Sequence, residues 1–255
     1  METEIVHIER TEQVAIVRID RPPANAIELA LAAQLEAALT RLTDEANIRA
    51  IVFTGTGRFF SAGLDLKIVP TYGVEDQKAL IMTINRLIHR LYSLALPTVA
   101  AVNGHAIAGG LVTMLTCDYR IGTTASCQMG LTESRVGIPY PAAAMEVVRA
   151  ELPPAVARTL VLRGLNSGSE TALAHGLLDE LQSPETLLAR AREVAVDLAS
   201  MPTLAYARIK RQLREGALTR MEEVLTRRSD PLLESWLTAD SAMASAEVLA
   251  RKRYP

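Results

Sequence analysis

The sequence is poor in aromatic residues and cysteine, and it has no long apolar run. Aromatic side chains make up 4% of the 255 residues and hydrophobic residues 49%, so the core is expected to be aliphatic. No apolar run approaches the roughly 18 to 20 residues that span a bilayer. The mixed, acidic start METEIVHIER lacks the basic and then apolar pattern of a signal peptide. We therefore expect no membrane partner and no secretory leader.

The two cysteines, Cys117 and Cys127, have neither CxxC spacing nor a histidine at metal-ligand spacing. This pattern favours two buried thiols over a disulfide or a metal site. A reduced, cytoplasmic setting without a bound metal is the expectation.

Neither acidic nor basic residues are in large excess. The net charge is -2 at pH 7 and charged residues make up 22% of the chain, which is typical of a folded globular protein and not of a disordered one. A near-neutral chain offers no basic groove for nucleic acid and no patch for an anionic membrane. Nucleic acid is therefore not an expected partner.

Complete phosphate-binding and nucleophile motifs are also missing. Phe60 stands where the dinucleotide fingerprint needs a glycine, and Gly110 stands where a P-loop needs its lysine. The chain has no GxSxG nucleophile elbow and no HExxH metal motif. No separate cofactor is expected on these grounds.

An alternation of strand and helix patterns is what the sequence does contain. Apolar runs predict strands, and regularly spaced leucines and small apolar residues predict the helices between them. The predicted strands lie at residues 14–20, 50–55, 98–104 and 117–123, and the predicted helices at 29–45, over about 20 residues ending near 94, and at 108–116. This order is typical of parallel crossovers in an α/β fold.

After about residue 153 the pattern becomes helical. Helices are predicted at residues 155–162, 186–199, 204–214 and 230–251. We divide the chain into a core of residues 1–195 and a helical segment of residues 196–255. The basic stretch 208–214 is expected to form a solvated helix face.

Two predicted strands lead into similar turns of small residues, SAGLDL at 61–66 and AIAGGL at 106–111, each followed by a predicted helix. The first N–H groups of a helix have no partner in the helix, and small residues let other atoms approach them. Two such turns side by side could aim two N–H donors at one oxygen, as in an oxyanion hole. Close packing between strand and helix would explain the small residues equally well.

A third stretch, GLTESRVGIP at 130–139, places Glu133 among mostly uncharged residues before a Gly-Ile-Pro turn. A single glutamate is usually a solvated charge or a helix cap. Glu133 alone therefore predicts no function, and it becomes a candidate site residue only together with the two turns of small residues.

Taken together, FFSAGLDLK, AAVNGHAIAGGLVTMLTCDYRI and GLTESRVGIP resemble the enoyl-CoA hydratase/isomerase (crotonase) superfamily. The resemblance extends through VLRGLNSGSETALAHGLLDEL, and so covers about residues 14–181. It implies a ClpP-like spiral of ββα units with a C-terminal helical segment that closes the pocket and mediates oligomerisation. It also implies an acyl-CoA thioester as substrate, with coenzyme A as part of that substrate, and a homotrimer or a dimer of trimers.

The resemblance assigns roles to particular positions. The thioester carbonyl would accept hydrogen bonds from the backbone N–H groups of Leu64 and Gly109, with Glu133 as the acid–base residue. The substrate-binding positions that it implies are Ala62, Gly63, Leu64, Asp65, Leu66, Gly109, Val112 and Thr132.

Val112 decides which reaction is expected. Hydratases of the family carry a first glutamate three residues after the glycine that matches Gly109, and in this chain that position is Val112. The pattern instead resembles mitochondrial-type Δ3,Δ2-enoyl-CoA isomerases, which work with one glutamate in fatty-acid β-oxidation or related acyl-CoA metabolism. Thr132 stands where that subgroup carries asparagine.

Two alternatives remain open. The first is another reaction of the same family, such as enoyl-CoA hydration or acyl-CoA hydrolysis. The second is a non-catalytic relative that binds acyl-CoA or RNA, or that serves as a scaffold.

Several further residues receive weaker expectations. Asp65 is expected to cap a helix that begins there, and Asp118 to be structural. Arg58 and Lys67 are each expected to be either a contact of the CoA phosphates or a solvated charge. Trp236 is expected to be a packing anchor.

Overall fold

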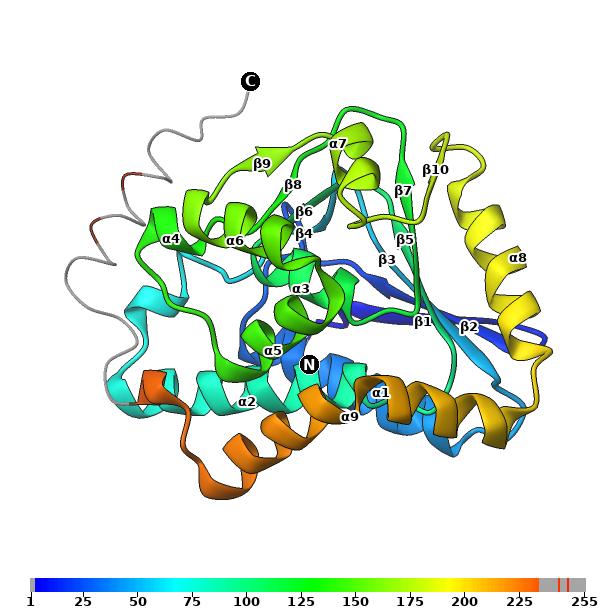
Figure 1. The fold of residues 1–255 in the computed structure, drawn as a ribbon, viewed down its shortest axis with the longest axis horizontal. Helices are drawn as coiled ribbons and strands as arrows, with labels where there is room; N and C mark the ends of the chain where they lie inside the picture. Colours follow the sequence, from blue (N-terminus) through cyan, green and yellow to red (C-terminus); the bar gives the residue numbers. More distant parts are fainter. Residues whose placement is uncertain (1–2, 234–242, 244–246, 248–255) are drawn as a thin grey trace.

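The computed structural model describes residues 3–233 together with residues 243 and 247, and it shows two β-sheets surrounded by helices (Figure 1). The larger sheet has six strands in the order β1-β2-β3-β5-β7-β10. Its strands are β1 (Val6–Thr11), β2 (Val14–Ile19), β3 (Ala50–Gly55), β5 (Thr98–Val102), β7 (Tyr119–Thr123) and β10 (Glu180–Gln182). Only the β1–β2 pair is antiparallel, so the predicted parallel crossovers are present.

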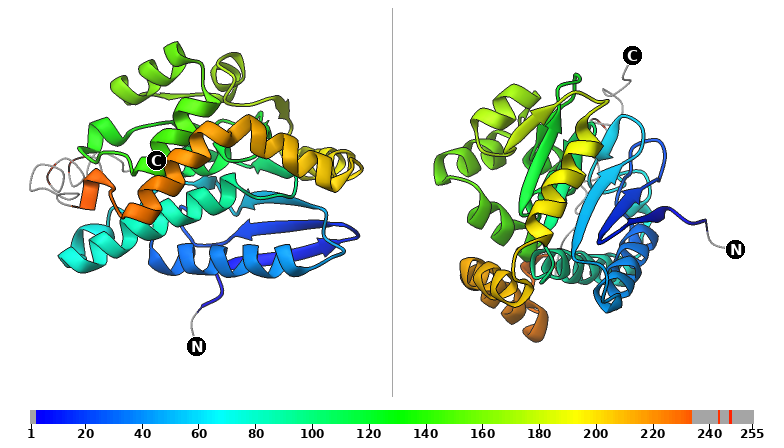
Figure 2. Two further views of the ribbon diagram at one scale, coloured as in Figure 1. Left: turned by 60° about the horizontal axis from the view of Figure 1, so that its bottom comes forward. Right: turned by 90° about the vertical axis from the view of Figure 1, so that its right-hand side faces the viewer.

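Both faces of this sheet are covered, which explains why β3 and β5 are continuous apolar runs. Alternate residues of a strand point to opposite faces. One face packs on α8 (Leu187–Ala199), whose Ala191, Ala195 and Ala199 are buried against it. The other face belongs to the main core with α1 (Leu29–Asp44) and α2 (Val74–Tyr92). The right panel of Figure 2 shows α8 and α1 on opposite sides of the strands.

The smaller sheet contains four short strands, β4 (Phe59–Ser61), β6 (His105–Ile107), β8 (Met129–Gly130) and β9 (Asn166–Ser167), in that order. The chain therefore repeats one unit: a strand of the larger sheet, a strand of the smaller sheet, then a helix. The three units are β3–β4–α2, β5–β6–α3 (Gly109–Leu115) and β7–β8–α4 (Glu133–Val136), with the short 3-10 helix η1 (Val69–Thr71) before α2. This confirms the expected spiral of ββα units.

The remaining helices complete the C-terminal half. They are α5 (Ala142–Glu151), α6 (Pro154–Arg163), α7 (Ser169–Ala174), α8, α9 (Thr203–Arg227) and the 3-10 helix η2 (Pro231–Leu233). Helix α9 continues beyond its predicted end at residue 214, through Gly216, because Ala217, Leu218 and Met221 are buried on its far side. The predicted boundary between residues 195 and 196 falls inside α8, and the division into two parts stays a prediction.

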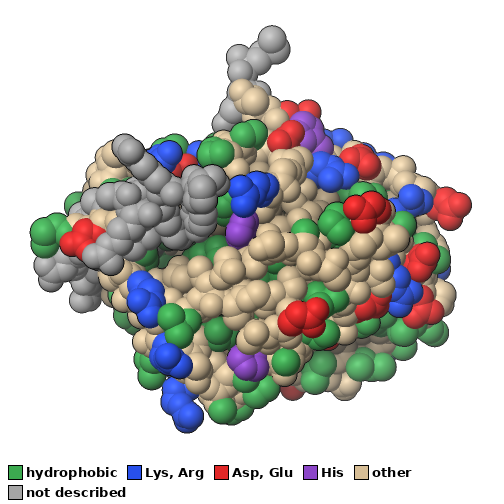
Figure 3. Space-filling view, turned by 90° about the horizontal axis from the view of Figure 1, so that it is seen from above, with side chains coloured by type: hydrophobic (Ala, Val, Ile, Leu, Met, Phe, Trp, Pro, Cys, Tyr) green, Lys and Arg blue, Asp and Glu red, His purple; other side chains and the backbone are tan. Residues whose placement is uncertain are grey.

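Other expectations for the end of the chain lie outside the described residues. These are Trp236 and, apart from η2 and two single positions, the helix predicted at 230–251. No helix among the described residues is long and apolar enough to cross a membrane. On the face shown in Figure 3, acidic and basic side chains are interspersed across a mostly uncharged surface.

The prediction of a solvated basic face on α9 is only partly confirmed, because Arg208 and Arg211 are exposed but two other basic residues of the stretch are not. Lys210 and Arg214 are buried, and both reach Asp118, which directly precedes β7. Lys210 Nζ lies 2.7 Å from Oδ2, and Arg214 Nη2 lies 3.0 Å from Oδ1. Asp118 also accepts a hydrogen bond from the backbone N–H of Thr98 at 2.8 Å. A buried carboxylate that compensates two cations is what permits this helix to pack inward, and it makes Asp118 structural, as expected. Cys117 and Cys127 are free, buried thiols.

Candidate active site

The three sequence stretches converge because their strands are neighbours in the smaller sheet. Strands β4 and β6 are parallel, as are β6 and β8, so their carboxyl ends meet at one edge. Leu64 follows the end of β4 by three residues, Gly109 follows the end of β6 by two, and Glu133 follows the end of β8 by three. The topology therefore collects segments that are far apart in the chain at one place.

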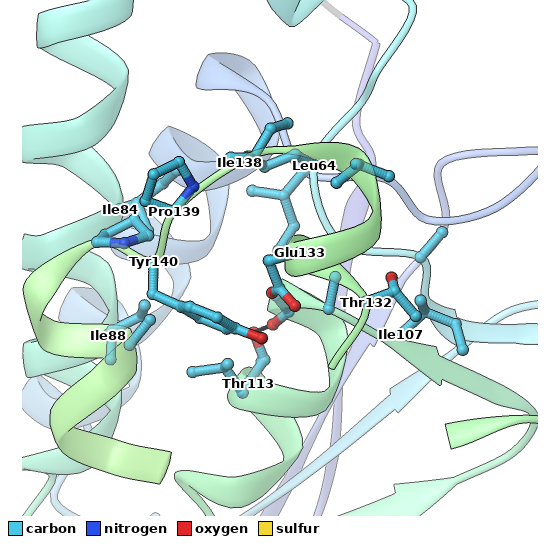
Figure 4. A pocket seen from close by; sticks show the side chains of 18 of the residues that line it. Leu64, Ile84, Ile88, Ile107, Thr113, Thr132, Glu133, Ile138, Pro139 and Tyr140 are labelled. Atoms are coloured by element: carbon cyan, nitrogen blue, oxygen red, sulfur yellow. Dashed lines mark hydrogen bonds between the residues drawn. The ribbon is translucent and has the colours of Figure 1, made fainter. Parts of the chain in front are cut away.

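A cavity of about 90 Å3 opens at this edge (Figure 4). It is lined by most of the predicted site residues together with apolar side chains from α2, α4, α5 and the turn after α4. The predicted residues that line it are Ala62, Leu64, Leu66, Gly109, Val112, Thr132 and Glu133. Gly63 and Asp65 are not among the lining residues.

Two backbone amides lie next to each other at the rim of the cavity. A Cβ atom added to Gly63 would come within 2.9 Å of the Gly109 nitrogen, and one added to Gly109 would lie 3.6 Å from the Gly63 Cα. Neither the Leu64 nor the Gly109 amide donates a hydrogen bond to another described residue. Two adjacent, unpaired N–H groups are the requirement for an oxyanion hole.

The small residues of the two turns are explained by their contact with each other. Gly63 adopts a φ of +77°, in the left-handed region that favours glycine, and it has no room for a side chain against Ala108. Gly110 is equally confined, because an added Cβ would lie 2.2 Å from the Ser61 carbonyl oxygen. The packing that requires small residues also brings the Gly63 backbone against the Gly109 amide, so the two explanations of the small residues are compatible.

The Leu64 and Gly109 amides lie in different backbone structures, so the prediction that a helix directly follows each turn is wrong for the first turn. Gly109 opens helix α3, but no helix begins directly after Gly63, since the 3-10 helix η1 starts only at Val69. Leu64 instead forms an isolated parallel bridge with Ile27, and the Ile27 N–H donates to the Gly63 carbonyl at 2.7 Å. This pairing holds the segment extended, so the next α-helix, α2, starts only at Val74.

Asp65 consequently does not cap a helix. Its Oδ2 accepts from Arg21 Nη1 at 2.8 Å, and its Oδ1 accepts from the Lys67 N–H at 3.1 Å within a turn. Arg58 and Lys67 do not line the cavity, and their contact with CoA phosphates stays a prediction.

Glu133 is the first residue of α4 and is buried, with 8% of its surface exposed. Its Oε2 atom has no hydrogen-bond partner in the described structure. Burial raises its pKa to about 7, although the nearby Tyr140 hydroxyl and the Glu133 N–H oppose part of this rise. Glu133 is therefore poised between base and acid near neutral pH.

The rest of the cavity wall is mostly apolar. Val112, at the position where hydratases carry their first glutamate, is fully buried and offers no hydrogen bond. The Thr113 hydroxyl already donates to the Gly109 carbonyl at 2.9 Å. Among the described lining residues, Glu133 is the only carboxylate.

Sequence reasoning missed several lining residues. Ile84, Leu87 and Ile88 of α2 close one side of the cavity. The spacing of these apolar residues predicts one apolar face of a helix, but it does not predict that this face lines the cavity. Tyr140 was also missed, although its position between two prolines, seven residues after Glu133, could have signalled a fixed turn at the site.

Comparison with known proteins agrees with this geometry. A family model described as enoyl-CoA hydratase/isomerase matches residues 9–253. The carnitinyl-CoA dehydratase of Escherichia coli strain K12 is 29% identical over 257 residues, which cover 99% of this chain and 98% of that protein.

Solved structures show the same relationship. An enoyl-CoA isomerase from Mycobacterium tuberculosis is 31% identical with a TM-score of 0.81, covering 87% of this chain and 96% of that one. Human mitochondrial Δ3-Δ2-enoyl-CoA isomerase is 25% identical with a TM-score of 0.91, covering 97% and 98%. The chain belongs to the enoyl-CoA hydratase/isomerase family, within the crotonase superfamily.

Proposed function

We propose that this acyl-CoA enzyme is a Δ3,Δ2-enoyl-CoA isomerase that uses Glu133 as its only acid–base residue. The observation that carries the proposal is the presence of one carboxylate, buried and without a partner at Oε2, in a cavity whose other walls are mostly apolar. The likeness to human mitochondrial Δ3-Δ2-enoyl-CoA isomerase supports it, whereas the Mycobacterium tuberculosis relative is described both as an isomerase and as a probable hydratase. The coenzyme A of the substrate is the only cofactor-like group that the reaction requires.

Substrate activation is assigned to the two backbone amides. The thioester carbonyl oxygen accepts hydrogen bonds from the Leu64 and Gly109 N–H groups. As the C2 proton leaves, negative charge develops on this oxygen, and donors already in place stabilise that charge without reorganisation. The side chain of Leu64 serves only as a wall.

Glu133 moves the proton. Its carboxylate removes a proton from C2 and forms a dienolate whose charge rests on the thioester oxygen. The same carboxylic acid then returns a proton to C4, which leaves the double bond between C2 and C3 and restores the carboxylate. A pKa of about 7 suits both roles, because near neutral pH the Glu133 carboxylate is a stronger base than an ordinary carboxylate and its acid form still holds the proton that it returns to C4.

The apolar wall disfavours water addition. Hydration needs a second polar group that orients a water molecule toward C3, and Val112 cannot do so. The buried cavity also keeps bulk water from the dienolate.

Hydration or dehydration of an acyl-CoA is the second candidate function. The full-length similarity to carnitinyl-CoA dehydratase favours it. This reaction would need a group other than residue 112 to hold the water, and it differs from isomerisation by a change in mass.

The proposal is tested with 3-hexenoyl-CoA and, separately, 2-hexenoyl-CoA, following products by mass and ultraviolet absorbance. We expect conversion of the 3-enoyl to the 2-enoyl thioester at constant mass, and loss of this activity in Glu133→Gln. CoA-thioester binding should survive in the variant because the oxyanion donors are backbone groups. Water addition to the 2-enoyl substrate without any isomerisation would instead establish the second candidate.

A further inference from the structure

Tyr140 contributes a second unpaired polar group to the cavity. Its hydroxyl oxygen is buried and has no hydrogen-bond partner among the described residues. Buried hydroxyl groups are normally paired, because an unpaired one loses its hydrogen bonds to water without replacement. An unpaired hydroxyl at a substrate cavity therefore points to a partner that is not yet in place.

The Tyr140 side chain is directed at the site. In Figure 4 its ring extends from the turn after α4 toward the Glu133 carboxyl. No well-formed hydrogen bond involves the Tyr140 hydroxyl or Glu133 Oε2 among the described residues. A looser interaction between the two side chains nevertheless lowers the Glu133 pKa and adds to the rise in the Tyr140 pKa that burial causes. Catalytic hydrogen bonds are often loose in a free enzyme and tighten when substrate binds.

The backbone around Tyr140 is held firmly. Pro139 and Pro141 restrict the chain on both sides, and α5 begins directly after them at Ala142. Two buried side chains fix the first amides of α5: Asp230 Oδ2 accepts from the Ala142 N–H at 2.8 Å, and Asn85 Oδ1 accepts from the Ala143 N–H at 2.9 Å. A residue supported in this way can place its hydroxyl reproducibly.

We propose that Tyr140 is a positioning residue for Glu133. When an acyl chain fills the cavity and excludes water, the Tyr140 hydroxyl donates a hydrogen bond to the Glu133 carboxylate and orients it between C2 and C4. The tyrosine keeps its proton throughout, and the proton that moves passes only between the substrate and Glu133. This inference rests on the proposed proton shuttle.

The test compares Tyr140→Phe with the wild-type enzyme. Phenylalanine retains the ring, and the hydroxyl that is lost has no partner in the free protein, so the melting temperature should not fall. Loss of a hydrogen bond to a charged group should lower kcat for 3-hexenoyl-CoA roughly tenfold or more, with a smaller effect on KM. Because a donor that favours the carboxylate is removed from the complex, the Glu133 pKa in the complex should rise and the acid limb of the kcat profile should move to higher pH.

Direct titration separates this inference from the proposed function. The Glu133 pKa is measured by NMR on protein saturated with hexanoyl-CoA, a thioester that has no double bond to isomerise, and labelled with 13C at the glutamate carboxyl carbons. The signal is assigned through its absence in Glu133→Gln. Tyr119→Phe is the matched control, since its hydroxyl donates to Glu180 at 3.3 Å and not to the cavity. This control should change neither kcat nor the Glu133 titration.

A Glu133 pKa that is the same in Tyr140→Phe and the wild type would overturn the inference, even if isomerisation is observed. A raised pKa in the variant would support it, even if the wild type proves to be a hydratase. Loss of water addition with no change in the Glu133 titration would show that Tyr140 holds a water molecule, which also overturns the inference.

Discussion

Substitution of Gly63 by alanine tests whether contact between the two turns creates the oxyanion hole. The new Cβ would lie 2.9 Å from the Gly109 nitrogen, the Ile107 carbonyl oxygen and the Ala108 Cβ. These are backbone atoms and a short side chain, so one turn has to move away from the other. The movement should separate the Leu64 and Gly109 amides.

Two terms contribute to the expected loss of stability. Alanine at a φ of +77° costs on the order of 1 to 3 kcal/mol, and overpacking adds about 1 to 3 kcal/mol. Gly57→Ala is the matched control, because Gly57 has a φ of +63° but nothing within 4 Å of an added Cβ. Gly57→Ala should therefore lose only the stability that a left-handed alanine costs, and it should keep its activity.

Urea unfolding and steady-state kinetics on 3-hexenoyl-CoA measure the two effects. We expect Gly63→Ala to be less stable than Gly57→Ala and to lose roughly a hundredfold in kcat, as when one oxyanion donor is removed. A Gly63→Ala enzyme with wild-type kcat and the stability of the control would refute the coupling between turn packing and the oxyanion hole.

Two other predictions concern the cavity itself. Glu133→Gln should be more stable than the wild type at pH 8, by up to about 3 kcal/mol, because a pKa raised from 4.5 to about 7 means that the folded state resists ionisation. The wild type should lose this stability as pH rises from about 4.5 through 7, so the difference in unfolding free energy should disappear at low pH; a constant difference would argue against the raised pKa. Val112→Glu should add some hydration of 2-hexenoyl-CoA, detected as a gain in mass, and no gain would mean that cavity shape or water placement also differs.

Four strands of the larger sheet, β2, β3, β5 and β7, could be predicted because they are apolar and separated by helices with regular spacing. Strand β1 and the three-residue strand β10 were not predicted. The smaller sheet could not be predicted, since strands such as β8, with two residues, are too short to show a period. Yet this sheet is what places the three site segments side by side.

The features of the site also divide into those that the sequence predicts and those that depend on contacts between distant parts of the chain. Glu133 and the two turns are recognisable through the family resemblance, but the isolated Leu64–Ile27 bridge that keeps the first turn out of a helix is a tertiary contact. The inward packing of Lys210 likewise depends on Asp118, 92 residues away in the chain. Side-chain direction at Tyr140 is set by its turn and by α5, and neither leaves a periodic signal.

The most direct test of a single proton shuttle follows one hydrogen atom. The substrate is 3-hexenoyl-CoA carrying deuterium at C2, and the 2-enoyl product is examined by NMR and mass spectrometry for deuterium at C4. One buried carboxylate that removes and returns the proton predicts that part of the deuterium is transferred from C2 to C4, and that Glu133→Gln gives no product. Product with hydrogen from water at C4 in every turnover, or label transfer that persists in Glu133→Gln, would contradict the account.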